Sequence, residues 1–216
     1  MNYKKEKENL VKHWKRERVV NNKSVLDAFL SVPRENFVLK EYKSDAYHDH
    51  PLPILSGQTI SQPTTVIIML DHLKVNKGDN ILEIGAGSGY HAALLSILTG
   101  SRGKVISTEV VPELVDYSKK NLKKYKNVKV IKVDSDLIGF KKNAPYDKIL
   151  VTAALPDVPD ELYNQLNNGG VLVLPVGGEY SQEMLAITRL KGNLRNIERL
   201  GFFQFVPVRG KFGFLP

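Results

Sequence analysis

The chain has 216 residues, 42% of them hydrophobic and 25% charged, with a formal net charge of +8; this composition is typical of a soluble globular domain with a sizeable core. It contains no cysteine, which excludes disulfides, thiol catalysis and zinc–thiolate sites. No apolar run approaches the ~18 residues that span a bilayer, and the basic start leads into no apolar signal segment. We therefore expect a cytoplasmic protein without a membrane partner.

Much of the positive charge lies in two stretches, Lys12 to Arg18 and Lys119 to Lys126. Both stretches have helical spacing, so a solvated helix face explains their charge at least as well as RNA does. No aromatic residues interleave with these lysines to stack bases. The charge is thus weak support for nucleic acid, which we do not expect as a partner.

Apolar periodicity predicts helices over residues 3–20, 25–31 and 62–74, with Ser24 as the N-cap of the second. Residues 33–60 lack a clear period and are rich in proline and polar residues, so we expect loops, turns and short extended pieces. A segment of this length with little regular structure is more often functional than decorative.

From residue 80 onward, predicted strands and helices alternate, which is typical of a parallel sheet. The predicted strands are 81–84, 104–109, 128–133, 147–152 and 170–175, and the predicted helices are 90–98, 112–125 and 159–167. Two later runs, 184–190 and 202–208, flank a turn at 191–193 and predict an antiparallel pair that closes one sheet edge.

The expected fold class is therefore α/β, with a Rossmann-like doubly wound, mostly parallel sheet, an antiparallel edge pair and an N-terminal helical and loop extension. We expect two parts in one compact unit. Residues 1–76 form the extension with a substrate loop, and residues 77–216 form the cofactor-binding core.

The stretch from Asn80 to Tyr90 is a strand, a glycine-dense turn and the start of a helix. Backbone N–H groups without Cβ obstruction at a helix N-terminus favour an anion. The glycines at 85, 87 and 89 do not follow the dinucleotide spacing G-x-G-x-x-G, because Tyr90 stands where the last glycine belongs. Glu83 adds negative charge before the turn.

This E-x-G-x-G-x-G pattern resembles the first motif of S-adenosylmethionine-dependent methyltransferases of the Rossmann-like class. Turn amides can hold the carboxylate of the cofactor, and Glu83 offers negative charge to its cationic end. An NAD-type cofactor, or a turn that only lets helix pack on strand, are the alternatives. The cofactor-binding candidates of this motif are Glu83, Gly85, Gly87, Ser88 and Gly89.

Acidic and hydroxyl residues follow the next strands. Glu109 ends the second strand, 20 residues after Gly89, where a carboxylate accepts hydrogen bonds from ribose hydroxyls in related folds; the alternative is a glutamate that caps the following helix. The third strand leads into Asp134, Ser135 and Asp136, which either contact the adenine amino group or only form a turn.

Thr152 ends the fourth strand before two alanines, which would leave room for a transferring methyl group. We include it among the cofactor-binding candidates.

Gln58, Thr59, Ile60 and Ser61 precede a proline that starts a helix. Two hydroxyls and an amide at this position suit an anion such as a carboxylate, or else Thr59 or Ser61 caps the helix. No serine has the G-x-S-x-G setting of an esterase nucleophile.

A metal site is not expected. His48 and His50 flank Asp49, but their i, i+2 spacing in a proline-rich loop without cysteine or a further nearby histidine argues against a metal ligand set.

These segments together resemble the protein-L-isoaspartate (D-aspartate) O-methyltransferases, and the resemblance runs from about residue 24 to 208. The segments that carry it are 32–38, 47–52, 57–63, 82–90, 144–147, 151–154, 174–177, 181–185 and 205–208. The glycine motif alone indicates only a methyltransferase, whereas residues 58–63 combined with it are highly specific.

The resemblance implies transfer of a methyl group from S-adenosyl-L-methionine to the α-carboxylate of L-isoaspartyl residues in damaged proteins, leaving S-adenosyl-L-homocysteine. The ester then cyclises to a succinimide, which can reopen to aspartate. By the family pattern Ser61 is the active-site residue, Thr59 helps to hold the substrate carboxylate, and Ser88, Glu109 and the residues after the third strand bind the cofactor.

One departure from the family pattern is Asp134-Ser135-Asp136, where the family usually has Gly-Asp-Gly. It leaves open which residue contacts adenine. It also motivates a non-catalytic cofactor-binding relative as an alternative, and the +8 charge motivates a methyltransferase of the same fold acting on RNA or a small molecule.

The chemistry fits the residues, because a carboxylate is already ionised above its pKa of ~4 and needs no general base. Hydroxyl and amide donors that hold it in line with the methyl group can then suffice.

Overall fold

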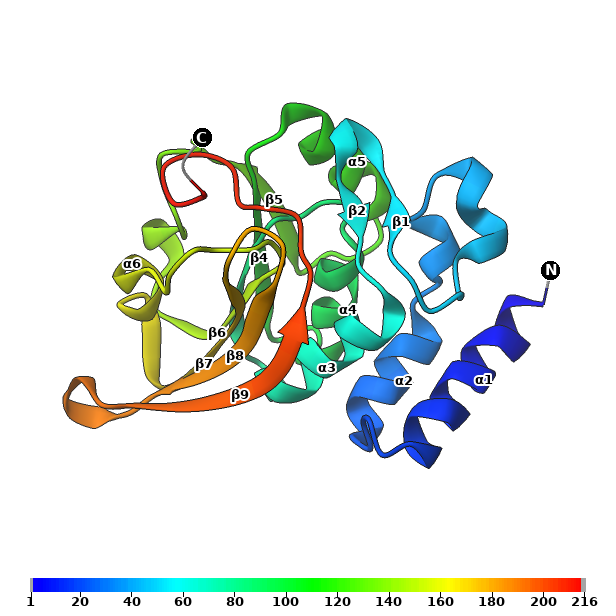
Figure 1. The fold of residues 1–216 in the computed structure, drawn as a ribbon, viewed down its shortest axis with the longest axis horizontal. Helices are drawn as coiled ribbons and strands as arrows, with labels where there is room; N and C mark the ends of the chain where they lie inside the picture. The colour runs from blue at the N-terminus through cyan, green and yellow to red at the C-terminus, as the bar shows by residue number, and fades with distance from the viewer. Residues whose placement is uncertain (1, 215–216) are drawn as a thin grey trace.

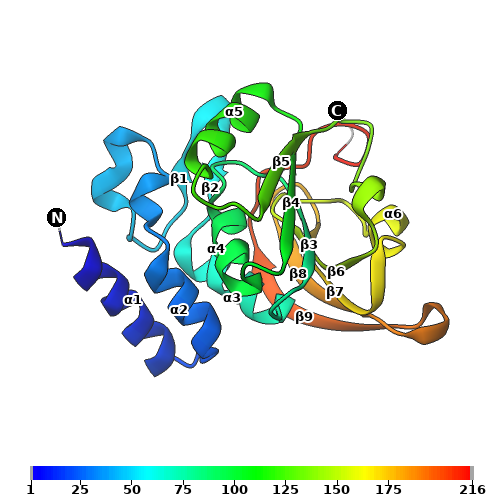
Figure 2. The same cartoon turned by 180° about the vertical axis from the view of Figure 1, so that it is seen from behind.

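The computed structural model describes residues 2–214. Its centre is a seven-stranded sheet in the order β5-β4-β3-β6-β7-β8-β9 (Figures 1 and 2). The strands are β3 (Asn80–Ile84), β4 (Lys104–Glu109), β5 (Val128–Lys132), β6 (Tyr146–Val151), β7 (Leu166–Gly177), β8 (Gln182–Arg189) and β9 (Arg195–Phe203). The first five strands of this order pair in parallel, and β8 and β9 are antiparallel at one edge. This confirms the predicted Rossmann-like sheet with its antiparallel edge pair.

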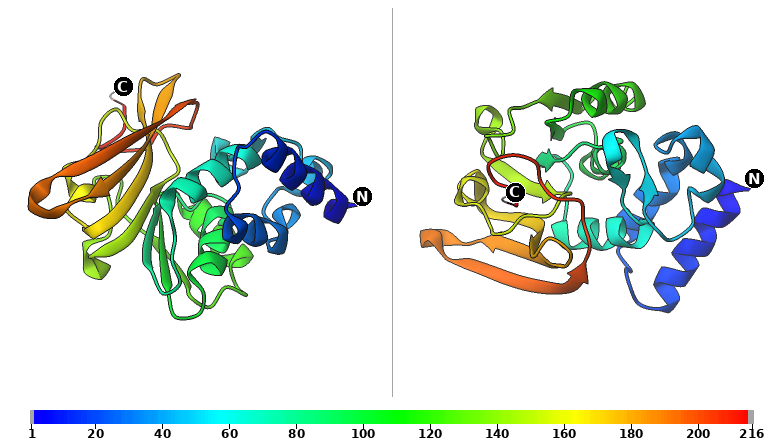
Figure 3. Two further views of the ribbon diagram at one scale, coloured as in Figure 1. Left: turned by 90° about the horizontal axis from the view of Figure 1, so that it is seen from below. Right: turned by 45° about the horizontal axis from the view of Figure 1, so that its top comes forward.

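Helices cover the two faces of the sheet unequally (Figure 3). The helices are α1 (Tyr3–Arg16), α2 (Lys23–Ser31), α3 (Pro63–Leu73), α4 (Tyr90–Thr99), α5 (Pro112–Asn121) and α6 (Asp160–Tyr163). Residues alternate in β3, so Ile81 packs among α1–α5 and Leu82 packs with Leu162 of α6. The second face is closed by α6 and by loop residues such as Phe212.

The two N-terminal helices share the core of the sheet domain. Trp14 of α1 is fully buried, and its Nε1 donates a 2.7 Å hydrogen bond to Thr64 Oγ1 at the start of α3. Lys7 Nζ donates to the carbonyls of Leu30 and Val32, where α2 ends. A cation at this end also complements the helix dipole. The extension is therefore packed against the core.

Residues 33–60 contain short elements only, as predicted. Leu52–Pro53 (β1) and Thr59–Ile60 (β2) form an antiparallel hairpin around a 3₁₀ turn, η3, at Leu55–Gly57. Further 3₁₀ turns are η1 (Arg34–Asn36), η2 (Lys40–Asp45), η4 (Lys141–Asn143) and η5 (Lys191–Asn193). The hairpin lies beside α5 in Figure 1.

Several element ends differ from the sequence predictions. Three helices end about four residues early, at Arg16, Asn121 and Tyr163. The N-cap of α2 is Asn22, whose side chain accepts the backbone N–H of Ser24, so the assignment of Ser24 as the cap was wrong. Both residue types cap well, and the register of the buried helix face decides between them.

The last strand was also placed too late. β9 ends at Phe203 instead of running over 202–208, because the Gln182 side chain takes the backbone N–H of Phe205 at 2.8 Å. Pro207 has no N–H to donate to a ladder, and the segment instead bridges Ala154 near the end of β6.

No helix within residues 2–214 combines the length and the apolar character that crossing a membrane requires.

Candidate active site

A central cleft opens at the carboxyl ends of β3, β4 and β6, where the strand order reverses between β3 and β6. In open α/β sheets this is the position at which ligands bind. The structure brings nine of the predicted site residues to this cleft, from four separate segments: Gln58, Thr59, Ile60, Ser61, Gly85, Gly87, Ser88, Glu109 and Thr152. Glu83, Gly89, Asp134, Ser135 and Asp136 do not line it.

The glycine turn requires its glycines for two different reasons. Gly85 has φ of +92°, and a Cβ there would lie 2.5 Å from Thr152 Oγ1. Thr152 in turn donates to the carbonyls of Ile84 at 3.0 Å and Gly85 at 2.7 Å, so it fixes the turn as well as lining the cleft. Gly89 has φ of +87°, and a Cβ there would lie 2.9 Å from Leu122 Cδ1. The absence of a side chain at Gly89 therefore lets α5 pack closely against the glycine turn.

Glu109 holds the turn from the neighbouring strand. Its Oε2 accepts the N–H of Gly87 at 2.9 Å, and its Oε1 accepts the N–H groups of Val110 and Val111. The carboxylate thus links the end of β4, the turn and the residues that precede α5. It also faces both the cleft and the adjoining hollow described below, where a ribose hydroxyl would find an acceptor.

Most backbone amides of the turn are already used within the protein. Gly85 and Ala86 donate to the carbonyl of Thr108, Gly87 donates to Glu109, and Gly89 donates to Ala86. Within the described residues, the amides of Ser88, Tyr90 and His91 have no such partner. An anionic group at this helix start therefore has donors from Ser88, Tyr90 and His91 rather than from the whole turn.

Glu83 lies beneath the turn instead of in the cleft. It is fully buried, accepts a hydrogen bond from the Ser107 hydroxyl, and its Oε1 has no partner within residues 2–214. Burial raises the pKa of Glu83 to about 8, against the lowering effect of hydrogen bonds from Ser107 and the Ala92 amide. The side chain is therefore mostly neutral at pH 7 and ties β3 to β4 and α4.

An adjoining hollow, which we call the apolar annex, continues from the cleft past Glu109. It is lined by Val111, Leu137, Ile138 and Phe212 together with Ser135. Apolar walls with few polar groups suit an adenine ring.

Of Asp134, Ser135 and Asp136, only Ser135 reaches the annex. Asp134 and Asp136 are exposed, and Asp134 Oδ1 accepts the backbone N–H of Asp136 at 3.0 Å. This local bond is the turn arrangement that the sequence left as an alternative.

The loop with Ser61 carries hydroxyl groups that do not cap the following helix, α3. The N-cap of α3 is Gln62, without a side-chain cap, so neither Thr59 nor Ser61 caps the helix. Asp49 occupies the helix start instead, because its carboxylate accepts the N–H of Thr64 at 2.9 Å and the Thr64 hydroxyl at 2.6 Å. Within the described residues, the Ser61 hydroxyl makes no hydrogen bond and faces the cleft.

The β1–β2 hairpin is held over the cleft by contacts from distant segments. Ser56 Oγ donates to Glu113 of α5 at 2.5 Å, and Arg209 donates to the Ser56 carbonyl at 3.1 Å. Ile54 and Gln58 pair through a 2.8 Å backbone bond. The position of residues 58–61 thus depends on α5 and on the C-terminal segment.

Three polar residues beside the cleft were missed by the sequence reasoning. Tyr90 and His91 line the cleft, and Arg34 is fully buried against the Tyr90 ring at 5.1 Å. Within residues 2–214, the Tyr90 hydroxyl, His91 Nε2 and both terminal nitrogens of Arg34 lack partners. Burial, helped by the charge of Arg34, lowers the pKa of His91 to about 3, so this ring is neutral. In the sequence, Arg34 and Tyr90 fall within the family-like segments 32–38 and 82–90, and His91 directly follows the second.

A broader groove, the aromatic groove, leads away from Ser61. It has a volume of about 750 Å³ and shares Thr59, Ser61 and Thr152 with the cleft. Two large rings stand beside it almost free of contacts, since Tyr180 is 79% exposed and Phe202 is 77% exposed. Exposed aromatic side chains next to polar donors are typical of a binding surface.

The arrangement fits a cofactor that carries a carboxylate and an aromatic base rather than a metal ion. Among the residues described, no group of three or more His, Cys, Asp or Glu is placed to hold a metal ion. The free amides of Ser88, Tyr90 and His91, the Glu109 carboxylate and the apolar annex adjoin one another and offer donors to a carboxylate, an acceptor to hydroxyl groups and apolar walls to a ring.

Comparison with known sequences supports this interpretation. The sequence model of the family described as Protein-L-isoaspartate(D-aspartate) O-methyltransferase (PCMT) matches residues 5–213. The chain is 47% identical over 197 residues to a protein-L-isoaspartate O-methyltransferase of Methanococcus maripaludis, covering 90% of this chain and 92% of that one. It is 43% identical over 214 residues to the protein of that name from Pyrococcus abyssi, covering 94% and 98%.

A solved structure with the same fold carries the spent cofactor. It is described as a protein-L-isoaspartate O-methyltransferase of Plasmodium falciparum in complex with S-adenosyl-L-homocysteine. It matches with a TM-score of 0.84 at 28% identity, covering 98% of this chain and 100% of that one.

The burial of Glu83 predicts a pH-dependent stability difference. A carboxyl whose pKa is raised in the folded state stabilises the fold at low pH, and this contribution is lost as pH rises from about 4.5 to about 8. Glu83→Gln cannot ionise, so from pH 5 to pH 8 it should gain stability relative to the parent, by up to about 4 kcal/mol. Urea unfolding of both proteins at pH 5 and pH 8 measures this difference. An equal change in the free energy of unfolding between the two pH values in both proteins would contradict the prediction.

Proposed function

The chain belongs to the protein-L-isoaspartate(D-aspartate) O-methyltransferase family, and on this premise we propose that the central cleft is where it performs the reaction of that family. It is an S-adenosylmethionine-dependent protein carboxyl methyltransferase that acts on L-isoaspartyl residues. The observation that carries the assignment of the site is the meeting of the Thr59 and Ser61 hydroxyls with the glycine turn in one cleft.

In this proposal, two parts of the chain have different roles. Residues 77–216 form the cofactor-binding core, and residues 1–76 are an extension that brings the substrate loop over it. Met1, Leu215 and Pro216 of these ranges lie outside the described residues. The shared hydrophobic core of α1–α5 supports one compact unit.

The cofactor lies across the turn in this proposal. The amides of Ser88, Tyr90 and His91 hold its carboxylate, Glu109 accepts its ribose hydroxyls, and the apolar annex with Ser135 takes its adenine. Gly85 and Thr152 shape the floor, and Gly89 permits the packing of α5. Glu83 acts through the turn and through Ser107, because its burial keeps it out of the cleft.

The methyl transfer needs alignment more than acid–base chemistry. S-adenosylmethionine, when bound, supplies an electrophilic methyl group on a sulfonium and leaves as a neutral thioether. The substrate α-carboxylate is ionised at neutral pH. Ser61 and Thr59 donate hydrogen bonds that aim one carboxylate oxygen at the methyl carbon, and positioning of this kind contributes up to ~7–11 kcal/mol.

The charges around the cleft suit an anionic substrate held by neutral donors. Burial lowers the pKa of His91 to about 3, which disfavours the protonated ring and makes His91 a weak base at pH 7. Asp49 already occupies the start of α3. The substrate carboxylate therefore relies on the side chains of residues 58–61 rather than on the helix dipole.

The aromatic groove receives the polypeptide on either side of the reacting residue. Its continuity with Ser61 and Thr59 supports this path. Tyr180 and Phe202 give apolar contact to flanking side chains without a requirement for one sequence.

The cytoplasmic location stays a prediction of the sequence analysis.

The activity itself is tested by methyl transfer from labelled S-adenosylmethionine. We expect label in an L-isoaspartyl peptide and none in its aspartyl twin or in tRNA. Transfer to tRNA alone would contradict the function. Tight binding of S-adenosylhomocysteine by calorimetry with no transfer to any isoaspartyl peptide would instead favour the non-catalytic alternative.

Ser61→Ala should lower kcat/KM for the isoaspartyl peptide by about 10- to 100-fold, because a charge-assisted hydrogen bond to the carboxylate is lost. Cofactor affinity measured by calorimetry should stay unchanged. Ser24→Ala, which removes an exposed hydroxyl on α2, serves as the control. An equal loss of cofactor affinity would argue against Ser61 as a substrate donor.

Phe202→Ala and Tyr180→Ala should each raise the KM for peptides with apolar flanking residues by about 5- to 10-fold, because interface aromatics typically contribute about 1 kcal/mol or more. The KM for S-adenosylmethionine should not change. Leu194→Ala alters a similarly exposed apolar residue, 66% exposed, at the other end of β9 and should have no effect. Unchanged peptide KM in both aromatic variants would remove the groove from the substrate path.

A further inference from the structure

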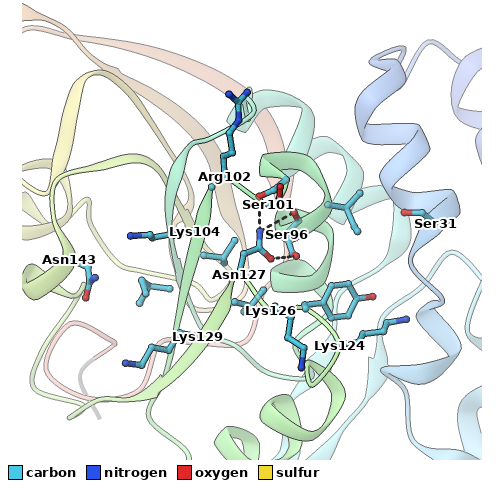
Figure 4. A pocket seen from close by; sticks show the side chains of 17 residues that line it. Ser31, Ser96, Ser101, Arg102, Lys104, Lys124, Lys126, Asn127, Lys129 and Asn143 are labelled. Carbon is cyan, nitrogen blue, oxygen red and sulfur yellow. Dashed lines mark hydrogen bonds between the residues drawn. The ribbon is translucent and has the colours of Figure 1, made fainter.

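A hollow larger than the aromatic groove lies at the end of the strands opposite to the cleft, at the amino ends of β4 and β5. It has a volume of about 900 Å³. Five basic side chains line it, Arg102, Lys104, Lys124, Lys126 and Lys129 (Figure 4). We call this site the basic hollow.

The positive charge of the basic hollow has no protein counter-charge. No Asp or Glu lines it, and within residues 2–214 none of its five cations takes part in an ion pair. All five side chains are exposed. Gathering like charges is unfavourable even in water. An anion that neutralises them would relieve this repulsion.

The cations approach the hollow from both faces of the sheet. Lys104 and Lys129 extend to one side together with Asn143, whereas Lys124 and Lys126 lie toward Ser31 of α2 (Figure 4). The register pairs Ile106 with Lys129, so Lys104 and Lys129 share a face. This spread suits an extended polyanion that lies around the sheet edge better than a single compact anion.

The backbone that carries these cations is fixed. Asn127 Nδ2 donates to the carbonyls of Gly100 at 2.9 Å and Ser96 at 3.3 Å, and the Ser96 hydroxyl donates back to its side-chain carbonyl. These bonds join the turn before β5 to the end of α4. Lys126 and Arg102 therefore start from a preorganised frame, which lowers the entropic cost of binding.

The lining favours an acidic polypeptide over a nucleic acid. Tyr125 is the aromatic residue of the hollow, but it is only 7% exposed and packs against Lys124 and Phe37. It therefore offers no face on which a base could stack.

We propose that the basic hollow docks an acidic segment of the substrate polypeptide while an isoaspartyl residue elsewhere on the same chain occupies the central cleft. This proposal rests on the proposed function. The second contact raises the effective concentration of the reacting residue at the cleft without adding any contact to the residue itself.

The distance between the basic hollow and the central cleft determines which substrates gain a higher effective concentration at the cleft. β4 runs from the hollow to the cleft, and its first residue, Lys104, is five residue steps from its last, Glu109, which corresponds to ~17 Å along the strand. A spacer of about four residues spans at most ~14 Å and cannot reach. A flexible Gly/Ser spacer of about 20 residues has an r.m.s. length of ~25 Å and can.

The test compares isoaspartyl peptides that carry, after either spacer, a tail of about ten glutamates or ten glutamines. With the long spacer and about 0.05 M salt, the glutamate tail should lower KM about tenfold relative to the glutamine tail, and about 0.5 M salt should abolish the difference. With the short spacer the two tails should give equal KM. Equal KM for the long-spacer pair at low salt overturns the proposal, whereas failure to methylate any peptide overturns the proposed function instead.

Matched charge variants locate the effect. Arg102→Gln, Lys126→Gln and Lys129→Gln combined should remove the tenfold advantage and leave the KM of the glutamine-tailed peptide unchanged. Lys4→Gln, Lys12→Gln and Lys15→Gln combined remove the same charge from exposed positions of α1 and should keep the advantage. Equal loss in both variants would show a general charge effect and overturn the site.

A direct binding measurement separates the ligand classes. Fluorescence anisotropy of a labelled ten-residue glutamate peptide should show binding that the triple variant of the hollow loses. Tighter binding of a duplex RNA of similar charge, lost in the same variant and displacing the peptide, would assign the hollow to nucleic acid and overturn the proposal.

Discussion

The close approach of Gly85 to Thr152 is the constraint on which the site depends. A side chain at Gly85 would collide with Thr152 Oγ1 at 2.5 Å, and the bare backbone instead lets that hydroxyl bond the carbonyls of Ile84 and Gly85. Glu109 closes the other side through the Gly87 amide. Three strand ends and one helix start are thereby joined in a turn that leaves only a few amides free. A cofactor at this turn meets a floor that is already fixed before binding.

The substrate side is built differently, because its short hairpin cannot hold itself. β1 and β2 have two residues each, and such a hairpin is not stable alone. Its position comes from Glu113, Arg209 and the chain of bonds from Trp14 through Thr64 to Asp49. Both ends of the chain therefore contribute to the place of Ser61, which explains why an N-terminal helical extension accompanies a nucleotide-binding core.

The distribution of charge separates two tasks on opposite edges of the sheet. The cleft holds neutral donors, a neutral His91 and a single carboxylate used for hydrogen bonding, so it handles an anion without acid–base chemistry. Five basic side chains without an ion pair among the described residues gather at the amino ends of β4 and β5. A charged surface that far from the reacting atoms can influence capture of the substrate but not the barrier of the methyl transfer.

The alternating strands, the glycine turn and the family-like motifs were readable from the sequence, because strand period, turn glycines and short contiguous motifs are local properties. They determined the fold class and identified Ser61, Glu109 and Thr152 as candidate site residues. Tertiary structure alone decided that Glu83 is buried and mostly neutral, that Asp49 takes the start of α3, and that Asp134 and Asp136 turn away while Ser135 faces the annex. Each of these depends on which side chains from distant segments arrive at the same point, and no spacing along the chain records that.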